Sequence, residues 1–120
     1  MFYFPDYYCL VTTPELYYSE LKRMGLKERD WPEYTSSPTA NGTLWEFETP
    51  TGKTCMIVTI KDWQGKDPLE VAGLIVHEAT HIKQHVMRKM GEKCPGDEFE
   101  AYMMQNITQN LMQCFVEQTQ

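Results

Sequence analysis

The sequence has no long hydrophobic run, and no segment approaches the roughly 20 consecutive apolar residues that a membrane-spanning helix needs. Residues 1–6 carry neither a basic start nor a sustained apolar stretch, so we expect no secretory signal there. Internal repeats and low-complexity tracts are absent as well. These absences predict a cytoplasmic protein with no membrane partner.

Paired cysteines are also missing. The four cysteines are Cys9, Cys55, Cys94 and Cys114, and no two of them form a C-x-x-C pair. This spacing excludes a zinc ribbon and a thioredoxin-like redox motif. Without secretion, we expect reduced thiols that serve mainly as small core residues.

Basic residues are few. The sequence contains 11 Lys and Arg residues against 17 Asp and Glu residues, which gives a formal net charge of −6. Binding to nucleic acid depends on clustered Lys and Arg side chains that neutralise phosphates. The acidic balance therefore argues against a nucleic-acid partner.

The composition suits one ordinary globular domain. The chain has 120 residues, of which 42% are hydrophobic and 23% are charged. A chain of about this length buries roughly two-thirds of its unfolded surface, which supports a core without disulfides. We therefore expect a single domain that spans residues 1–120.

Helix and strand signals together predict an α+β fold. Thr13-Pro14-Glu15 is typical of a helix start, and Pro50-Thr51-Gly52-Lys53 is typical of a hairpin turn. The predicted elements are a short strand at 7–12, a helix at 14–24, a connector at 26–42, hairpin strands at 43–49 and 54–60, and helices at 68–90 and 97–117. We expect the hairpin, or a small antiparallel sheet, to pack on the helix at 68–90.

The helix at 68–90 carries the clearest signals. Asp67 can cap its first turn, Pro68 suits that turn, and Gly91 can end the helix. Residues 71–76 are apolar on every side of the helix, which is typical of a buried segment. We therefore expect the first half of this helix to lie in the core.

The same helix contains the sequence His77-Glu78-Ala79-Thr80-His81. A spacing of four residues puts His77 and His81 on one face, where both imidazoles can bind one Zn²⁺. Glu78 lies about 100° around the helix, where it can act as general base toward a water on the metal. The alternative is a pair of surface histidines with no metal.

This motif and the later segment Glu98-Phe99-Glu100-Ala101-Tyr102 resemble the zincin metallopeptidases of the gluzincin group. In that group, a Glu from a following helix joins the two His, often within an E-x-x-A sequence. The CAAX-prenyl endopeptidases and phage-immunity peptidases carry the E-x-x-A sequence. Residues 76–111 resemble short zincin-like proteins encoded by tailed bacteriophages. The resemblance implies a compact zincin-like domain with one Zn²⁺ and a ligand-bearing helix after the motif helix.

Two glutamates compete for the place of the third ligand. The family pattern implies Glu98, because Ala101 follows it by three residues. Helical phase favours Glu100, which is in phase with the apolar stripe that includes Met103 and Ile107. We give the family pattern more weight and expect His77, His81 and Glu98 to hold the metal, with Glu100 as the alternative.

These observations favour a zinc metallopeptidase that cleaves one or a few protein substrates, with Glu78 as the general base. The strand at 54–60 is the candidate for binding an extended peptide by strand addition. The alternative is a phage-encoded protein-binding module with a structural or vestigial zinc site. The short chain, which lacks a second lobe, favours that alternative, whereas the intact Glu78 argues against it.

Three further residues near the motif have less specific roles. His85 lies eight residues beyond His77, about 12 Å along a helix, so one metal cannot bind both. We expect His85 to support the site or to be exposed. Tyr102 is either a packing residue or a donor to a developing oxyanion. Cys94 is a less favoured candidate for a fourth, inhibitory ligand.

Overall fold

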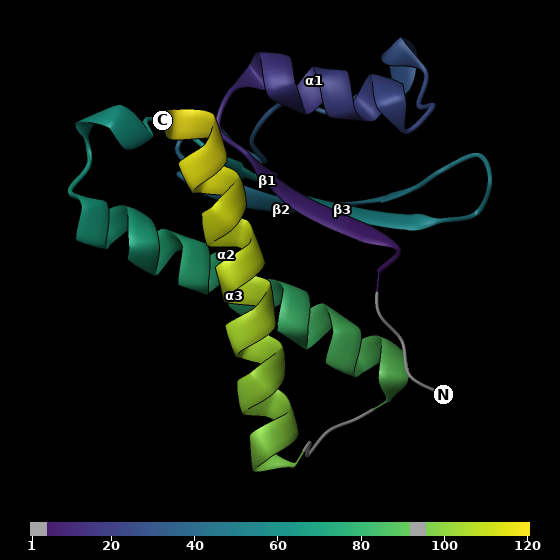
Figure 1. Cartoon of the computed structure of the whole chain (residues 1–120). Coiled ribbons are helices and arrows are strands. Elements are labelled where there is room, and N and C mark those ends of the chain that lie inside the picture. Colours follow the sequence, from purple (N-terminus) through teal and green to yellow (C-terminus); the bar gives the residue numbers. More distant parts are fainter. Residues whose placement is uncertain (1–4, 92–95) are drawn as a thin grey trace.

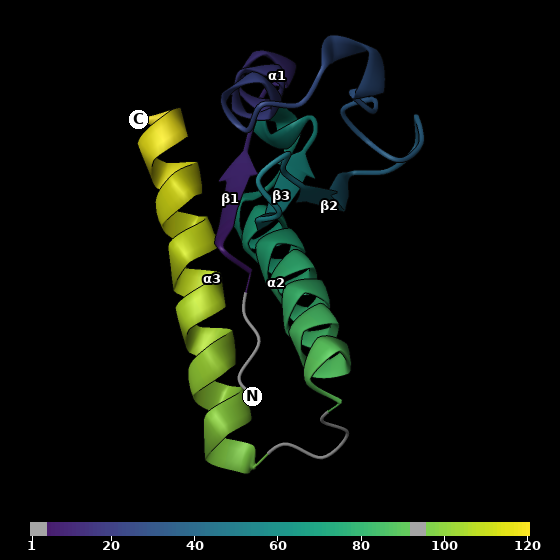
Figure 2. The same ribbon diagram turned by 90° about the vertical axis from the view of Figure 1, so that its right-hand side faces the viewer.

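The computed structural model describes residues 5–91 and 96–120, so the prediction for Cys94 lies outside the described residues. The elements are β1 (Tyr7–Val11), α1 (Pro14–Arg23), β2 (Gly42–Glu48), β3 (Thr54–Ile60), α2 (Pro68–Met90) and α3 (Asp97–Thr119), with short 3-10 turns at Glu28–Asp30 and Trp63–Gly65. The helix α1 covers one face of the sheet, while α2 and α3 cross each other on the other face (Figures 1 and 2). The predicted α+β class is therefore confirmed.

The sheet is mixed rather than antiparallel, which corrects the prediction. Its strand order is β1-β3-β2. β2 and β3 form the expected antiparallel hairpin, with Trp45 opposite Ile57. β1 pairs with the other edge of β3 in parallel, with Cys9 opposite Ile57. β3 is therefore the central strand. The turn between β2 and β3 reverses the chain, so β3 runs in the same direction as β1.

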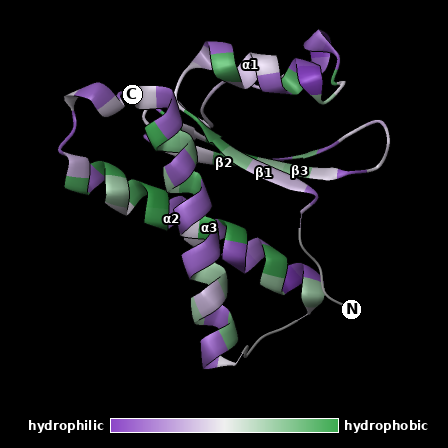
Figure 3. Cartoon of the chain, in the orientation of Figure 1, coloured by the Kyte–Doolittle hydropathy of each residue, from purple (hydrophilic) through white to green (hydrophobic). Residues whose placement is uncertain are grey.

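Alternate residues of the sheet supply two separate core clusters. On one face, Leu10 and the β3 residues Met56, Val58 and Ile60 pack against α2 and α3. On the other face, Ile57 packs with its neighbours against α1. This alternation follows from the two-residue period of a strand. Figure 3 shows hydrophobic residues along the sheet, whereas α2 and α3 interleave hydrophobic and hydrophilic residues.

The ends of α2 form as the sequence predicts. The side chain of Asp67 accepts a hydrogen bond from the Leu69 N–H at 2.7 Å, and Pro68 occupies the first turn. Gly91 ends the helix with φ of 70°, a left-handed conformation that glycine adopts without a steric penalty. Among residues 5–91 and 96–120, no helix combines the length and apolarity that crossing a membrane requires.

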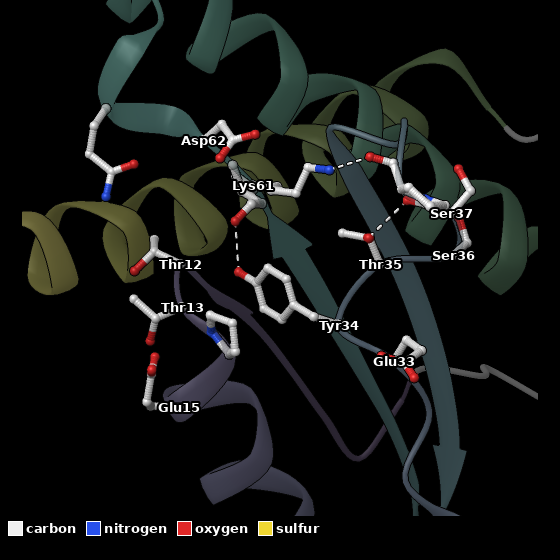
Figure 4. A pocket seen from close by; sticks show the side chains of 14 residues that line it. Thr12, Thr13, Glu15, Glu33, Tyr34, Thr35, Ser36, Ser37, Lys61 and Asp62 are labelled. Atoms are coloured by element: carbon white, nitrogen blue, oxygen red, sulfur yellow. Dashed lines mark hydrogen bonds between the residues drawn. The ribbon is translucent and has the colours of Figure 1, made fainter.

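The connector between α1 and β2 is fixed to the sheet by Tyr34. Its hydroxyl lies 3.1 Å from the carbonyl oxygen of Val11 and 2.7 Å from that of Ile60 (Figure 4 shows the Tyr34 side chain). The indole N–H of Trp45 donates to the Tyr34 carbonyl at 3.1 Å. The Ser36 N–H donates to the Thr43 hydroxyl at 3.0 Å. These bonds hold the connector beside the first residues of β2.

We expect Tyr34→Phe to lower the free energy of unfolding by about 1–2 kcal/mol, because the carbonyl oxygens of Val11 and Ile60 lose the one hydroxyl proton that they share. Urea denaturation measures this change. Tyr102→Phe is the matched control, since the Tyr102 side chain is 62% exposed, and it should change stability by less than about 0.5 kcal/mol. Equal stabilities of the two variants would contradict this role of Tyr34.

Candidate metal centre

His77 and His81 lie one turn apart on the exposed side of α2. Their Nε2 atoms are 3.2 Å apart, and their ring planes meet at 86°. A tetrahedral Zn²⁺ with bonds of 2.0–2.1 Å separates two nitrogen ligands by about 3.3–3.4 Å. The two side chains therefore fit a shared zinc ion with little movement.

The contact of His81 with Gln84 also suits metal binding. Nδ1 of His81 lies 3.1 Å from Oε1 of Gln84. With the Gln84 amide oxygen facing Nδ1, a proton on Nδ1 leaves the Nε2 lone pair of His81 free for a metal. Nε2 is the atom that faces His77. Gln84, which the sequence did not single out, thus orients a candidate ligand.

Glu78 lies against the sheet instead of beside the two histidines on the surface. It is only 4% exposed. Burial raises the pKa of its carboxyl group, and the nearby His77 and His81 partly offset that rise in pKa. A raised pKa makes a carboxyl group a stronger base than an exposed glutamate, which is the direction that a general base requires.

Gly42, the first residue of β2, gives the Glu78 carboxylate its space. A Cβ atom at Gly42 would lie 3.1 Å from Oε2 of Glu78 and 3.1 Å from the carbonyl oxygen of Thr59. Both distances are tighter than ordinary packing allows, and the Thr59 oxygen belongs to the backbone. The sequence placed Gly42 only at the end of the connector at 26–42. A glycine at the start of a β-rich run is the signal for such a close approach.

The histidine pair opens onto a groove between α2 and the edge of the sheet. The groove has a volume of about 500 Å³. Its lining consists of Ser36, Gly42, Thr43, Leu44, His77, Glu78, His81, Gln84, His85 and Arg88. One wall therefore comes from the connector and β2, and the other comes entirely from α2.

The structure does not bring the predicted third ligand to this groove. Glu98 is exposed in the first turn of α3. Oε2 of Glu100 accepts a hydrogen bond from Nζ of Lys83 at 2.6 Å. Lys83 lies about 200° around α2 from His81, so Glu100 is held on the opposite side of the helix.

Within the described ranges 5–91 and 96–120, no three His, Cys, Asp or Glu side chains are arranged to hold a metal ion. Three of the four predicted site residues, His77, Glu78 and His81, lie together in one groove. The assignment of Glu98 as third ligand stays a prediction.

The other residues singled out from the sequence lie at different distances from the pair. Nε2 of His85 is 2.6 Å from Oε2 of Glu46, so His85 joins α2 to β2. The sequence gave no signal for Glu46, because that contact joins residues far apart in the chain. Tyr102 is an exposed residue of α3 and does not line the groove.

A larger cavity of about 640 Å³ lies at the carboxyl ends of β1 and β3. Hydrogen bonds join the groups that line this cavity (Figure 4). The Tyr34 hydroxyl donates to the Ile60 carbonyl, and the Lys61 ammonium donates to the Pro38 carbonyl. It shares only Ser36 with the groove. Its described contacts serve to hold the connector.

A comparison of the chain with protein-family models, curated proteins and solved structures finds no match. The geometry of the groove is therefore the basis for assigning a function.

We expect Glu78→Gln to raise the melting temperature of the metal-free protein at pH 8. Because the folded-state pKa of Glu78 is raised, the folded protein holds the proton more tightly, and stability falls as pH rises through that pKa. The advantage of the variant should shrink as pH falls toward the ordinary glutamate pKa of about 4.3. Thermal melts with a chelator at several pH values measure it.

Glu28→Gln provides the control, since Glu28 is exposed and should show no such gain. If Glu78→Gln melts at a lower temperature than the parent at pH 8, the ionised Glu78 carboxylate does not destabilise the folded protein.

Proposed function

We propose that the protein is a zinc-dependent metallopeptidase that hydrolyses peptide bonds in one or a few protein substrates. The observation that carries the proposal is the combination of two Nε2 atoms 3.2 Å apart with a buried carboxyl group, Glu78, on the same helix turn. A structural zinc site does not need that carboxyl group, whereas hydrolysis does.

In this proposal, His77 and His81 hold the metal through Nε2, and Glu98 is the expected third ligand. Zn²⁺, when bound, supplies Lewis acidity that activates water and polarises a peptide carbonyl. Glu78 accepts a proton from the water on a carboxylate oxygen and then returns it to the leaving amine. Burial raises the pKa of the Glu78 carboxyl group, which makes it a stronger proton acceptor than an exposed glutamate.

We propose β2 instead of β3 as the peptide-binding strand. We predicted residues 54–60, but β3 is paired on both edges and offers no free hydrogen-bonding groups along its length. In the hairpin, the Lys61 N–H donates to Asn41 and the Thr49 N–H donates to Lys53. Because bonded pairs alternate along an antiparallel ladder, the backbone groups of Gly42, Leu44 and Glu46 point away from β3.

Those outward-facing groups lie on the strand that lines the groove beside His77, His81 and His85. An extended peptide that adds to β2 would therefore run past the histidine pair. This arrangement supports a peptide as the substrate class. The buried thiols of Cys9 and Cys55, which the structure shows unpaired, are consistent with a reducing cytoplasm as the site of action.

One observation favours a second candidate function. Since no residue of α3 lines the groove, a metal there would have only two of its expected protein ligands, His77 and His81. A phage-encoded protein-binding module with a structural or vestigial zinc site would tolerate such a site. It would use the same β2 edge to bind a partner without cleaving it.

We expect the parent protein to bind one zinc ion per chain. His77→Ala and His81→Ala should weaken that binding by about 100-fold or more, since each removes a ligand. Glu78→Gln should keep the zinc and lose peptide hydrolysis by about 10²–10⁴-fold. Zinc titration against a chromophoric chelator, with a peptide-library cleavage assay, measures both properties.

His85→Ala is the matched control on the same helix face, and it should retain zinc. Undiminished cleavage by Glu78→Gln would refute the assigned base. Retention of zinc by both His77→Ala and His81→Ala would refute the metal site.

Glu98→Gln should weaken zinc binding by about 100-fold, while Glu100→Gln, which alters only the contact with Lys83, should retain it. For Glu98 to reach the metal, the first turn of α3 has to change its position when zinc binds. The reverse pattern would assign the ligand to Glu100. Full zinc affinity in both variants would leave two histidines as the only protein ligands and would favour the binding module.

A further inference from the structure

Arg88 is the one Lys or Arg side chain in the described lining of the groove. It is exposed, and no ion pair of its guanidinium occurs among residues 5–91 and 96–120. The two carboxylates nearest to the groove do not form an ion pair with Arg88. Glu46 lies against His85, and Glu78 is buried beneath Gly42. An unpaired cation therefore faces the space that a peptide would occupy.

The position of Arg88 along α2 relates it to the histidine pair. Arg88 follows His81 by seven residues, which is about two turns and roughly 10.5 Å along the helix axis on the same face. An extended peptide rises about 3.3–3.4 Å per residue. Arg88 thus lies about three peptide residues away from the point where the chain passes His77 and His81.

The direction of β2 decides on which side of the cleaved bond that residue falls. β2 begins at Gly42, beside Glu78, and reaches Glu46, beside His85. A peptide that pairs antiparallel with β2, which is the more stable of the two pairings, runs the other way, from Arg88 toward His77. The residue next to Arg88 then lies on the N-terminal side of the bond at the histidine pair.

The charge of the whole chain makes this local cation informative. With a formal net charge of −6, the protein repels acidic peptides at long range. An acidic preference at one peptide position therefore has to come from a local group, and Arg88 is the Lys or Arg side chain that the groove supplies. A guanidinium also matches a carboxylate through two parallel hydrogen bonds, which an ammonium group does not.

We propose that Arg88 is a specificity-determining residue that selects peptides with an Asp or Glu about three residues before the bond at the histidine pair. This inference rests on the proposed peptide-binding function of the groove. It adds a substrate class to that function, namely extended peptides with one acidic residue at a fixed distance from the reacting bond.

The test uses zinc-loaded, full-length Glu78→Gln protein, so that binding is measured without hydrolysis. The probes are fluorescein-labelled decapeptides of Thr, Val and Ser that carry one Asp or one Lys at each position in turn. Fluorescence anisotropy should show about fivefold tighter binding of Asp than of Lys peptides at one favoured position, as expected for an exposed ion pair. The preference should fall in 0.5 M salt, because screening weakens such pairs.

Adding Arg88→Glu should reverse the preference, whereas adding Lys89→Glu should leave it intact. Lys89 is the matched control, because it is exposed, carries the same charge and does not line the groove. An unchanged acidic preference after Arg88→Glu is added overturns the inference. The absence of any acidic preference in the Glu78→Gln protein itself also overturns it. Failure of every peptide to bind overturns the proposed peptide site together with it. If the Glu78→Gln protein binds acidic peptides selectively but the unmutated protein does not hydrolyse them, the Arg88 assignment is supported and only the peptidase activity is overturned.

Discussion

The packing of α2 against the central strand β3 is the constraint on which the rest of the groove depends. Met56, Val58 and Ile60 of β3 form one buried cluster with residues of α2 that recur at helical spacing, such as Ile75 and Ile82. This contact fixes the rotation of α2 about its axis. Since His77 and His81 lie on a different face of the same helix, that rotation turns both imidazoles to the solvent side and Glu78 toward the sheet.

The buried position of Glu78 is costly, and the surrounding residues accommodate it only in part. Gly42 removes a side chain that would press on Oε2, but the desolvation that raises the carboxyl pKa remains. A buried carboxyl group beside two histidines is a candidate for the proposed general base. Gly42, which leaves room for the Glu78 carboxyl group, is also the first residue of the free edge of β2. The proposed base and the proposed peptide-binding edge therefore depend on one glycine.

The elements with strong local signals could be predicted from the sequence. The caps of α2, the β2–β3 hairpin and the histidine pair all follow from residues a few positions apart, such as Asp67 with Leu69 and His77 with His81. The parallel pairing of β1 could not be predicted, because it joins Cys9 to Ile57 across nearly fifty residues. Glu46 and Gly42 were missed for the same reason, since only the folded sheet brings them to α2. The role of Glu98 depends on whether α3 moves when zinc binds, which local sequence pattern does not determine.

The central claim is that one zinc ion lies between His77 and His81 above Glu78. The most direct measurement is a crystal structure of the zinc-soaked protein, with anomalous data collected on both sides of the zinc absorption edge. The account predicts one strong anomalous peak at about 2.0–2.1 Å from Nε2 of His77 and from Nε2 of His81. A peak elsewhere in the molecule, or none at the histidine pair at full zinc saturation, would contradict it.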